Sequence, residues 1–322
     1  MTRIYVFPGQ GSQKAGMGAA LFAKYPDAVA TADRVLGYSV TDLCLENADQ
    51  RLDRTEYTQP ALFLVNALSY MEKLAEGGRP DIVAGHSLGE YSALFAAGAF
   101  DLATGIALVK RRGELMARSS AGGMAAVMGL TESEVAEVLR AEGASTIDIA
   151  NLNGPNQIVL AGPREDLLAC KEPFLAAKAR SFVSLRVSAA FHSRYMADTA
   201  NEFRVFLRDI RMSPLQFPVV SNVDALPHEV ETIADKLVAQ IVSPVRWTET
   251  VRRLMSLDDP QFEEVGPGKV LAGLIRQIQK VSEPLAGSFL GRASNETAPS
   301  PGLAPQHRAA LENVHHGQND TN

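Results

Sequence analysis

Short apolar runs, glycine-rich turns and helix-forming stretches follow one another along the first part of the chain. Residues 4–7 form an apolar run that ends in the turn-forming segment 8–13. Apolar residues then recur at helical spacing over 21–36 and 61–74, and a second apolar run, 81–84, leads into another glycine-rich turn. Strand, turn and helix repeated in this order predict a mainly parallel sheet of the α/β class.

The pattern changes over residues 123–188. Strand-like and helix-forming runs occur there in the order β-α-β-β-α-β, which is the order of a ferredoxin-like unit. Thr131 and Glu134 form a capping box that opens the first of these helices. The elements are expected at 124–128, 132–140, 146–151, 157–161, 163–178 and 181–187. We therefore expect a small subdomain inserted into a larger one.

The α/β pattern resumes after the insertion. Helices are expected at 189–208, 233–242 and 270–278, and short strands at 218–222 and 260–265. Residues 1–122 and 189–281 are therefore assigned to one subdomain, and 123–188 to the inserted one. Residues 282–322 are non-periodic and rich in glycine, proline, serine and asparagine, which predicts a flexible tail.

The composition excludes several classes of protein. With 31 Lys and Arg against 37 Asp and Glu, the net charge is −6, whereas nucleic-acid binders and polybasic membrane-surface modules carry a basic excess. The longest apolar stretches are far shorter than the roughly 20 residues of a membrane helix, and no basic-then-apolar leader precedes the first strand. Cys44 and Cys170 form no disulfide or metal-binding pattern, so no metal is expected. These features predict a soluble, cytoplasmic protein.

The segment Gly85-His86-Ser87-Leu88-Gly89 matches the G-x-S-x-G nucleophile elbow. Glycines flank the serine in this motif because larger side chains would clash on the tight strand-to-helix turn. An apolar run precedes the motif and a helix-forming run follows it, as an elbow requires. The turn would place the Ser87 hydroxyl at a helix N-terminus, where free N–H groups favour developing negative charge. The alternative is a structural turn with a buried serine.

A serine nucleophile needs a base, and histidine is the usual one near neutral pH. Of the six histidines, three lie in the tail and His228 lies in a loop beside a proline. His86 adjoins Ser87 but points to the opposite side of the turn, so His192, in a polar turn before a helix, is the better candidate. No carboxylate stands out as a third member. A Ser–His pair oriented by a main-chain carbonyl is as consistent with the sequence as a triad.

With these residues in view, the chain resembles the malonyl-CoA:acyl carrier protein transacylases, most closely the discrete, trans-acting acyltransferases of polyketide synthases. The matching segments are FPGQGSQ at 7–13, TQPAL at 58–62, GHSLGE at 85–90, KRRG at 110–113, AFHS at 190–193, SPVRW at 243–247 and GPG at 266–268. They lie in order over residues 1 to about 280 and exclude the tail. The resemblance implies an α/β-hydrolase-like core with a ferredoxin-like insertion.

The resemblance also implies a role for each matching residue. Ser87 takes the acyl group and His192 is its general base. The main-chain N–H groups of Gln10 and Leu88 form the oxyanion hole. The Arg112 guanidinium binds the free carboxylate of the malonyl group; considered by itself, this residue would be a solvated charge on a helix face.

Four more residues are implied to line the acyl pocket: Gln59, His86, Asn153 and Phe191. A bulky residue at the position of Phe191 goes with malonyl in this family and a smaller one with branched units, although core packing is the alternative. In related enzymes an amide residue often lies where Arg246 is here, close to the histidine. The change is harmless if only the main-chain carbonyl of Arg246 orients His192, and it matters if the side chain contributes; the sequence leaves this open.

The implied activity is transfer of malonyl from malonyl-CoA to the phosphopantetheine thiol of an acyl carrier protein or carrier domain, through a malonyl-serine ester. No cofactor of its own is expected, because the partner carries the phosphopantetheine. The second hypothesis is an acyl hydrolase of the same fold that clears carrier proteins, and the third is a non-enzymatic scaffold. Whether the pathway makes fatty acids or polyketides stays open; the context of 189–194 favours polyketides.

Overall fold

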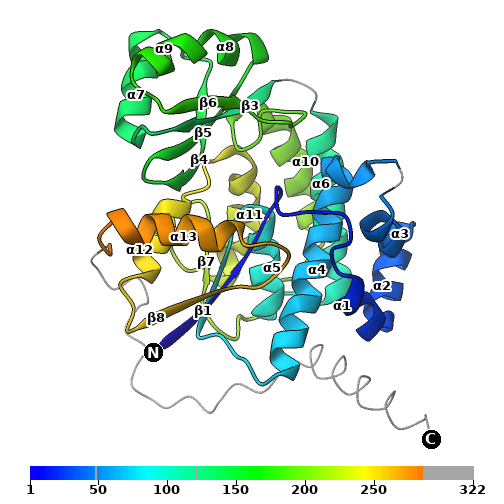
Figure 1. The fold of residues 1–322 in the computed structure, drawn as a ribbon. Coiled ribbons are helices and arrows are strands. Elements are labelled where there is room, and N and C mark those ends of the chain that lie inside the picture. The colour runs from blue at the N-terminus through cyan, green and yellow to red at the C-terminus, as the bar shows by residue number, and fades with distance from the viewer. Residues whose placement is uncertain (48, 120–121, 286–322) are drawn as a thin grey trace, which may run out of the picture.

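The computed structural model describes residues 1–47, 49–119 and 122–285, which form two four-stranded sheets (Figure 1). The first sheet is parallel and has the strand order β7-β2-β1-β8. Its strands are β1 (Thr2–Phe7), β2 (Ile82–Gly85), β7 (Val219–Val220) and β8 (Pro260–Glu264). Phe7 pairs with Gly85, so the segments that follow β1 and β2 leave the sheet at the same edge.

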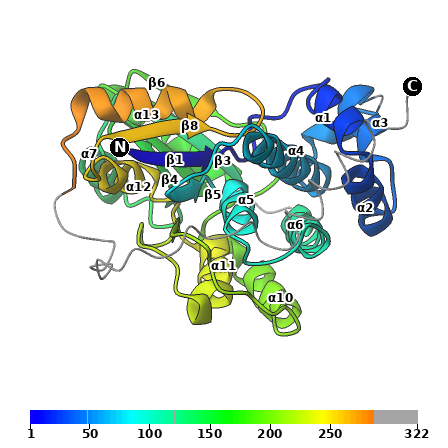
Figure 2. The same ribbon diagram turned by 90° about the horizontal axis from the view of Figure 1, so that it is seen from below.

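Helices cover both faces of the parallel sheet, and further helices pack on these. The helices of this subdomain are α1 (Ala19–Lys24), α2 (Pro26–Leu36), α3 (Val40–Leu45), α4 (Thr55–Ala75), α5 (Leu88–Ala96), α6 (Leu102–Arg118), α10 (Ala197–Leu207), α11 (Ile233–Val242), α12 (Trp247–Leu254) and α13 (Val270–Val281). Figure 2 shows α5, α6 and α11 gathered on the side of the sheet away from α13. Three 3₁₀ turns, 51–53, 194–196 and 230–232, join these elements.

Alternating side chains along β1 explain the two covered faces. Ile4 and Val6 pack into a cluster with residues of α12 and α13, whereas Tyr5 and Phe7 pack into the larger cluster with α4, α5 and α6. Successive side chains of a strand point to opposite faces, so an apolar run without alternation predicts burial on both sides. The predicted parallel α/β core is confirmed.

The second sheet is antiparallel and belongs to the inserted segment. Its strand order is β4-β5-β3-β6, which is the ferredoxin-like arrangement. The elements are β3 (Gly123–Met128), α7 (Glu132–Ala141), β4 (Asp148–Gly154), β5 (Gln157–Gly162), α8 (Arg164–Ala169), α9 (Lys171–Ala176) and β6 (Ser181–Ser184). The Thr131 capping box is formed as predicted. In Figure 1 this sheet lies above the parallel one, with α7, α8 and α9 on its outer side.

Main-chain hydrogen bonds join the inserted sheet to the core. Strand β4 forms a parallel bridge between Asn151 and Val245, which precedes α12. The Val245 N–H donates to the Ala150 carbonyl at 2.9 Å, and the Leu152 N–H donates to the Val245 carbonyl at 2.9 Å. The outer edge of β4 is therefore paired with the larger subdomain at this point.

Some predicted elements have different bounds in the structure. The helix expected over 21–36 is two helices, because the chain turns at Tyr25 and restarts with Pro26 as the first residue of α2. The helix expected over 189–208 begins only at the 3₁₀ turn 194–196, because His192 has a φ of 57° that a helix cannot accommodate. Helix α12 was not predicted.

Part of the predicted tail, residues 286–322, lies outside the described residues. Within the described part of the chain, no helix is both long and apolar enough to cross a bilayer. The same part contains no group of three or more His, Cys, Asp or Glu side chains that could hold a metal ion.

Helix α5 approaches β1 so closely that residue 89 has no room for a side chain. A Cβ on Gly89 would overlap the carbonyl oxygen of Phe7. We expect Gly89→Ala to lower the free energy of unfolding by about 3 kcal/mol, because backbone would have to move. Urea unfolding measures this change. The matched control is Gly273→Ala in α13, where a Cβ meets no atom within 4 Å, and there we expect a gain of about 0.5–1 kcal/mol. Wild-type stability in Gly89→Ala would contradict the close approach.

Candidate active site

Ser87 lies on the turn between β2 and α5, in a strained backbone conformation with φ 50° and ψ −105°. The glycines on either side make this turn possible: a Cβ on Gly85 would overlap the backbone of Gly89. The turn ends β2 and begins α5 within two residues, so the serine side chain lies at the helix N-terminus. This is the geometry of a nucleophile elbow.

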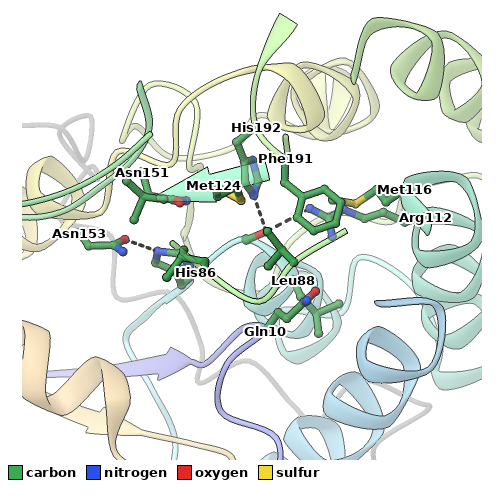
Figure 3. A pocket seen from close by; sticks show the side chains of 14 residues that line it. Gln10, His86, Leu88, Arg112, Met116, Met124, Asn151, Asn153, Phe191 and His192 are labelled. Carbon is green, nitrogen blue, oxygen red and sulfur yellow. Dashed lines mark hydrogen bonds between the residues drawn. The ribbon is translucent and has the colours of Figure 1, made fainter. Parts of the chain in front are cut away.

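The Ser87 hydroxyl and the His192 ring face each other, with Oγ and Nε2 2.8 Å apart (Figure 3). The second ring nitrogen, Nδ1, lies 2.8 Å from the main-chain carbonyl oxygen of Gln240. A carbonyl can only accept, so Nδ1 carries the proton and Nε2 presents its lone pair to the serine. The structure therefore places His192 in the tautomer that a general base needs, with a main-chain carbonyl in the place of a third carboxylate.

The environment of His192 keeps its ring neutral. Burial of the side chain and, after that, the positive charge of Arg112 lower the pKa of His192 from 6.5 to about 3. His192 is only 4% exposed, which agrees with burial as the larger cause. An uncharged imidazole is available to accept a proton throughout the neutral pH range.

Arg112, from α6, is a fully buried cation at the inner end of the site. Its Nη1 donates to Gln59 Oε1 at 2.7 Å, and its Nη2 donates to Gln240 Oε1 at 2.9 Å and to Ser87 Oγ at 3.1 Å. All three acceptors are neutral, and within the described residues Arg112 Nε has no hydrogen-bond partner. A buried guanidinium with an unused donor can bind a carboxylate brought by a ligand.

A cavity of about 170 Å³ opens onto these groups. Ser87 lines it, and Figure 3 shows His192, Arg112 and Phe191 around it. Gln10 and Leu88 also line the cavity, and the Leu88 amide, as the first of α5, has no acceptor within the helix. Both residues implied for the oxyanion hole are thus at the cavity beside the nucleophile.

His86 and Asn153 line the far side of the same cavity. His86 Nε2 lies 2.7 Å from Asn153 Oδ1, and its ring packs edge-on against Trp247. Burial lowers the pKa of His86. His86 therefore bonds away from the serine, and His192 is the histidine beside it.

The structure corrects one expectation from the sequence and answers one open question. Gln59 was expected to line the pocket; it lies behind Arg112 instead, accepting from Nη1 and donating to the Met116 sulfur at 3.3 Å. The role of Arg246 was open; its side chain forms an ion pair with Glu249 at 2.5 Å. The carbonyl that orients His192 belongs to Gln240.

Sequence reasoning missed a set of buried polar residues beneath the elbow: Glu90, Asn222, His228 and Gln240. Asn222 Oδ1 accepts from the Ser87 N–H at 2.7 Å, and Gln240 Nε2 donates to the Ser87 carbonyl at 3.0 Å. One signal was available: Gln240 interrupts the apolar face of the helix predicted over 233–242. A polar side chain on a buried helix face must find partners there.

Comparisons with known proteins agree with this geometry. The acyl transferase domain family matches residues 4–313. The polyketide biosynthesis malonyl CoA-acyl carrier protein transacylase BaeC of Bacillus velezensis is 51% identical over 281 residues, covering 87% of this chain and 97% of that protein. The crystal structure of a malonyl CoA-acyl carrier protein transacylase from Burkholderia pseudomallei matches with a TM-score of 0.85 and 42% identity, over 88% of this chain and 99% of that one.

A third match is a malonyl-transacylase in complex with its type II polyketide synthase acyl-carrier protein. It has a TM-score of 0.83 and 34% identity, and the match covers 97% of this chain and 100% of that one. A serine on a nucleophile elbow, paired with a neutral histidine, defines the class of serine-dependent acyl-transfer proteins. Within that class, the chain belongs to the acyl transferase domain family.

The low pKa of His192 predicts how the site responds to acid. Because the folded ring stays neutral well below pH 6.5, we expect the rate of Ser87 acylation to stay level between pH 8 and pH 5. Stopped-flow measurement of thiol release in the first turnover gives this rate, and circular dichroism at each pH checks that the protein stays folded. A fall with a midpoint near pH 6.5 would contradict the predicted environment of the ring.

Proposed function

We propose that the protein transfers a malonyl group from malonyl-CoA to the phosphopantetheine thiol of an acyl carrier protein, through a malonyl ester of Ser87. The observation that carries the proposal is the buried Arg112 guanidinium 3.1 Å from Ser87 Oγ. Malonyl is a short diacid. With this spacing, Ser87 would hold its acyl end while Arg112 binds the free carboxylate at the other end. The names of BaeC and of the Burkholderia pseudomallei protein support the same reaction.

In the first stage, Ser87 Oγ attacks the thioester carbon and passes its proton to His192 Nε2. The carbonyl oxygen becomes an oxyanion that the amides of Gln10 and Leu88 stabilise. Loss of one such donor typically raises the barrier by about 2.7–4 kcal/mol. The intermediate then breaks its C–S bond, and the coenzyme A thiolate takes the proton back from His192.

In the second stage, the carrier thiol gives its proton to His192 and attacks the malonyl-serine ester. The C–O bond to Ser87 breaks, and the serine oxygen recovers the proton. Both stages use only residues of this chain and groups that arrive with the substrates. We therefore propose that the enzyme needs no cofactor of its own, and that the phosphopantetheine is part of the partner.

Arg112 favours malonyl over acetyl because a planar guanidinium can donate two parallel hydrogen bonds to a carboxylate. Bonds of this charge-assisted kind contribute roughly 1.5–3 kcal/mol each. The malonyl carboxylate would take the donors that now contact Ser87 Oγ. Substrate binding then leaves the hydroxyl bonded to His192 alone, in the position to react.

We propose further that the carriers are those of a polyketide synthase, served in trans. Support comes from BaeC, which is named as a polyketide biosynthesis enzyme, and from the solved complex of a malonyl-transacylase with a polyketide carrier protein. Fatty acid synthesis is the alternative, supported by the 38% identity to the malonyl CoA-acyl carrier protein transacylase of Escherichia coli. Coenzyme A thioesters are made and used in the cytoplasm, where we propose that the enzyme works.

The proposed function is tested with malonyl-CoA, with and without holo carrier protein, while free coenzyme A and the masses of both proteins are followed. We expect a malonyl adduct on the enzyme, absent in Ser87→Ala, that moves to the carrier. Fast release of malonate without a carrier would favour the hydrolase of the same fold. No adduct in the wild-type protein would favour a non-enzymatic scaffold.

Replacing the buried cation tests malonyl selection. We expect Arg112→Ala to lower kcat/KM for malonyl-CoA at least a hundredfold, because about 3 kcal/mol or more of carboxylate binding is lost. The matched control is Arg111→Ala, which removes a neighbouring cation that pairs with Glu202 outside the cavity. Equal kcat/KM values in the two variants would contradict the role of Arg112.

Phe191 lines the cavity beside His192 and is 5% exposed. We expect Phe191→Ser to raise kcat/KM for methylmalonyl-CoA relative to malonyl-CoA about tenfold or more, because one extra methyl group then fits. Competition between the two thioesters, with the carrier products resolved by mass, measures the ratio. An unchanged ratio would leave Phe191 with a packing role only.

A further inference from the structure

The carboxylate of Glu90 is fully buried and takes no part in the reaction as proposed. Glu90 lies in the first turn of α5, three residues after the nucleophile, and it does not line the cavity. It accepts three hydrogen bonds: from Asn222 N at 3.1 Å, Gln240 Nε2 at 2.6 Å and His228 Nε2 at 2.7 Å. A buried carboxylate is costly unless such donors surround it, so its position needs an explanation.

The first of these donors also holds the elbow. Asn222 Oδ1 accepts from the Ser87 N–H at 2.7 Å, while its Nδ2 donates to the Gly85 carbonyl at 2.7 Å. The Asn222 side chain therefore forms hydrogen bonds with the backbone of Gly85, two residues before the serine, and with the backbone of Ser87 itself. Glu90 fixes Asn222 from behind through the main-chain N–H.

The second donor, Gln240, contacts three groups of the reaction. Its main-chain carbonyl accepts from His192 Nδ1, and its Oε1 accepts from Arg112 Nη2 at 2.9 Å. Its Nε2 donates to the Ser87 carbonyl at 3.0 Å. Gln240 therefore contacts His192, Arg112 and Ser87 and fixes their positions relative to one another.

The orientation of the Gln240 carboxamide depends on Glu90. An arginine only donates and an ionised carboxylate only accepts, so Oε1 must face Arg112 and Nε2 must face Glu90. Rotating the amide by 180° would set donor against donor and acceptor against acceptor. With a group at position 90 that can also donate, the preference for this orientation is weaker, because only Arg112 and the Ser87 carbonyl then distinguish Oε1 from Nε2.

The negative charge of Glu90 also stabilises the charged form of Arg112. Burial lowers the pKa of Arg112, and the negative charges of Tyr91, when ionised, and of Glu90 oppose that shift. His228 completes the shell by donating to the remaining Glu90 oxygen, with both side chains fully buried. The Glu90 carboxylate is therefore held behind the guanidinium, with the Gln240 carboxamide between them.

We infer that Glu90 is a positioning residue: its carboxylate fixes the Gln240 carboxamide, and through it Arg112 and His192, around Ser87. The inference rests on the proposed function, because its effect is read in the choice between malonyl and acetyl groups. Arg112 distinguishes these two groups, so a loss of its fixed acceptor lowers malonyl transfer more than acetyl transfer. A merely structural role would lower both alike.

The test compares Glu90→Gln with the wild-type enzyme in transfer to holo carrier protein. The substitution keeps the size and adds a donor that faces Gln240 or His228. We expect kcat for malonyl to fall at least tenfold and the malonyl-to-acetyl ratio of kcat/KM to fall at least fivefold. Glu90→Asp, which keeps an acceptor-only group, is expected to hold the ratio within about twofold of the wild-type value.

The matched control is Glu264→Gln. Glu264, the last residue of β8, also accepts two N–H groups, from Leu271 at 3.2 Å and Ala272 at 2.8 Å in the first turn of α13, and it does not line the cavity. We expect its malonyl-to-acetyl ratio to equal that of the wild-type enzyme. A fall as large as in Glu90→Gln would overturn the inference, since any lost carboxylate would then have the same effect.

Equal losses of malonyl and acetyl transfer in Glu90→Gln would also overturn it. If that variant does not fold, Gln240→Met takes its place, because it removes the carboxamide and keeps the main-chain carbonyl; an unchanged ratio there overturns the inference. Wild-type protein that transfers no malonyl group would overturn the proposed function itself. Wild-type transfer with unchanged ratios in the variants would overturn only the role of Glu90.

Discussion

A buried guanidinium whose hydrogen-bond acceptors are all neutral is the constraint on which the active site depends. Removing a cation from water costs several kcal/mol, and neutral acceptors recover only part of that cost. Within the described residues, the acceptors of Arg112 are the Gln59 and Gln240 amide oxygens and the Ser87 hydroxyl. The fold keeps the cation at full burial without a directly bonded carboxylate, which leaves its donors available to a carboxylate that a substrate would supply.

The same cation also acts on the base and the nucleophile. Arg112 adds to the burial that lowers the pKa of His192, and it donates to the hydroxyl that His192 must activate. A carboxylate bound to Arg112 would offset the effect of the cation on the pKa of His192. It would also compete with the Ser87 hydroxyl for the Arg112 donors. In the proposed mechanism, the charge that selects the acyl group therefore also influences the base and the nucleophile.

Local chemistry explains which features the sequence could predict. The elbow was predictable because Gly85 and Gly89 are required by contacts within five residues of one another. The strands of the parallel sheet were predictable because apolar runs without alternation indicate burial on both faces. The residue that orients His192 was not predictable, because a main-chain carbonyl leaves no trace in the identity of its residue; the carbonyl belongs to Gln240. The shell around Glu90 joins residues more than 130 positions apart, and the orientation of a buried amide appears only once its neighbours are placed.

The pairing of β4 with Val245 limits how the enzyme could evolve towards larger acyl groups. Asn151 lines the cavity and belongs to the bridge that joins the inserted sheet to the core, so the width of the cavity on this side is set by backbone hydrogen bonds. The two subdomains cannot spread apart there without breaking those bonds. Accommodating a longer acyl chain would therefore require smaller side chains on the wall of the cavity opposite Asn151. Sequence differences between homologues with different acyl substrates should be concentrated on that wall.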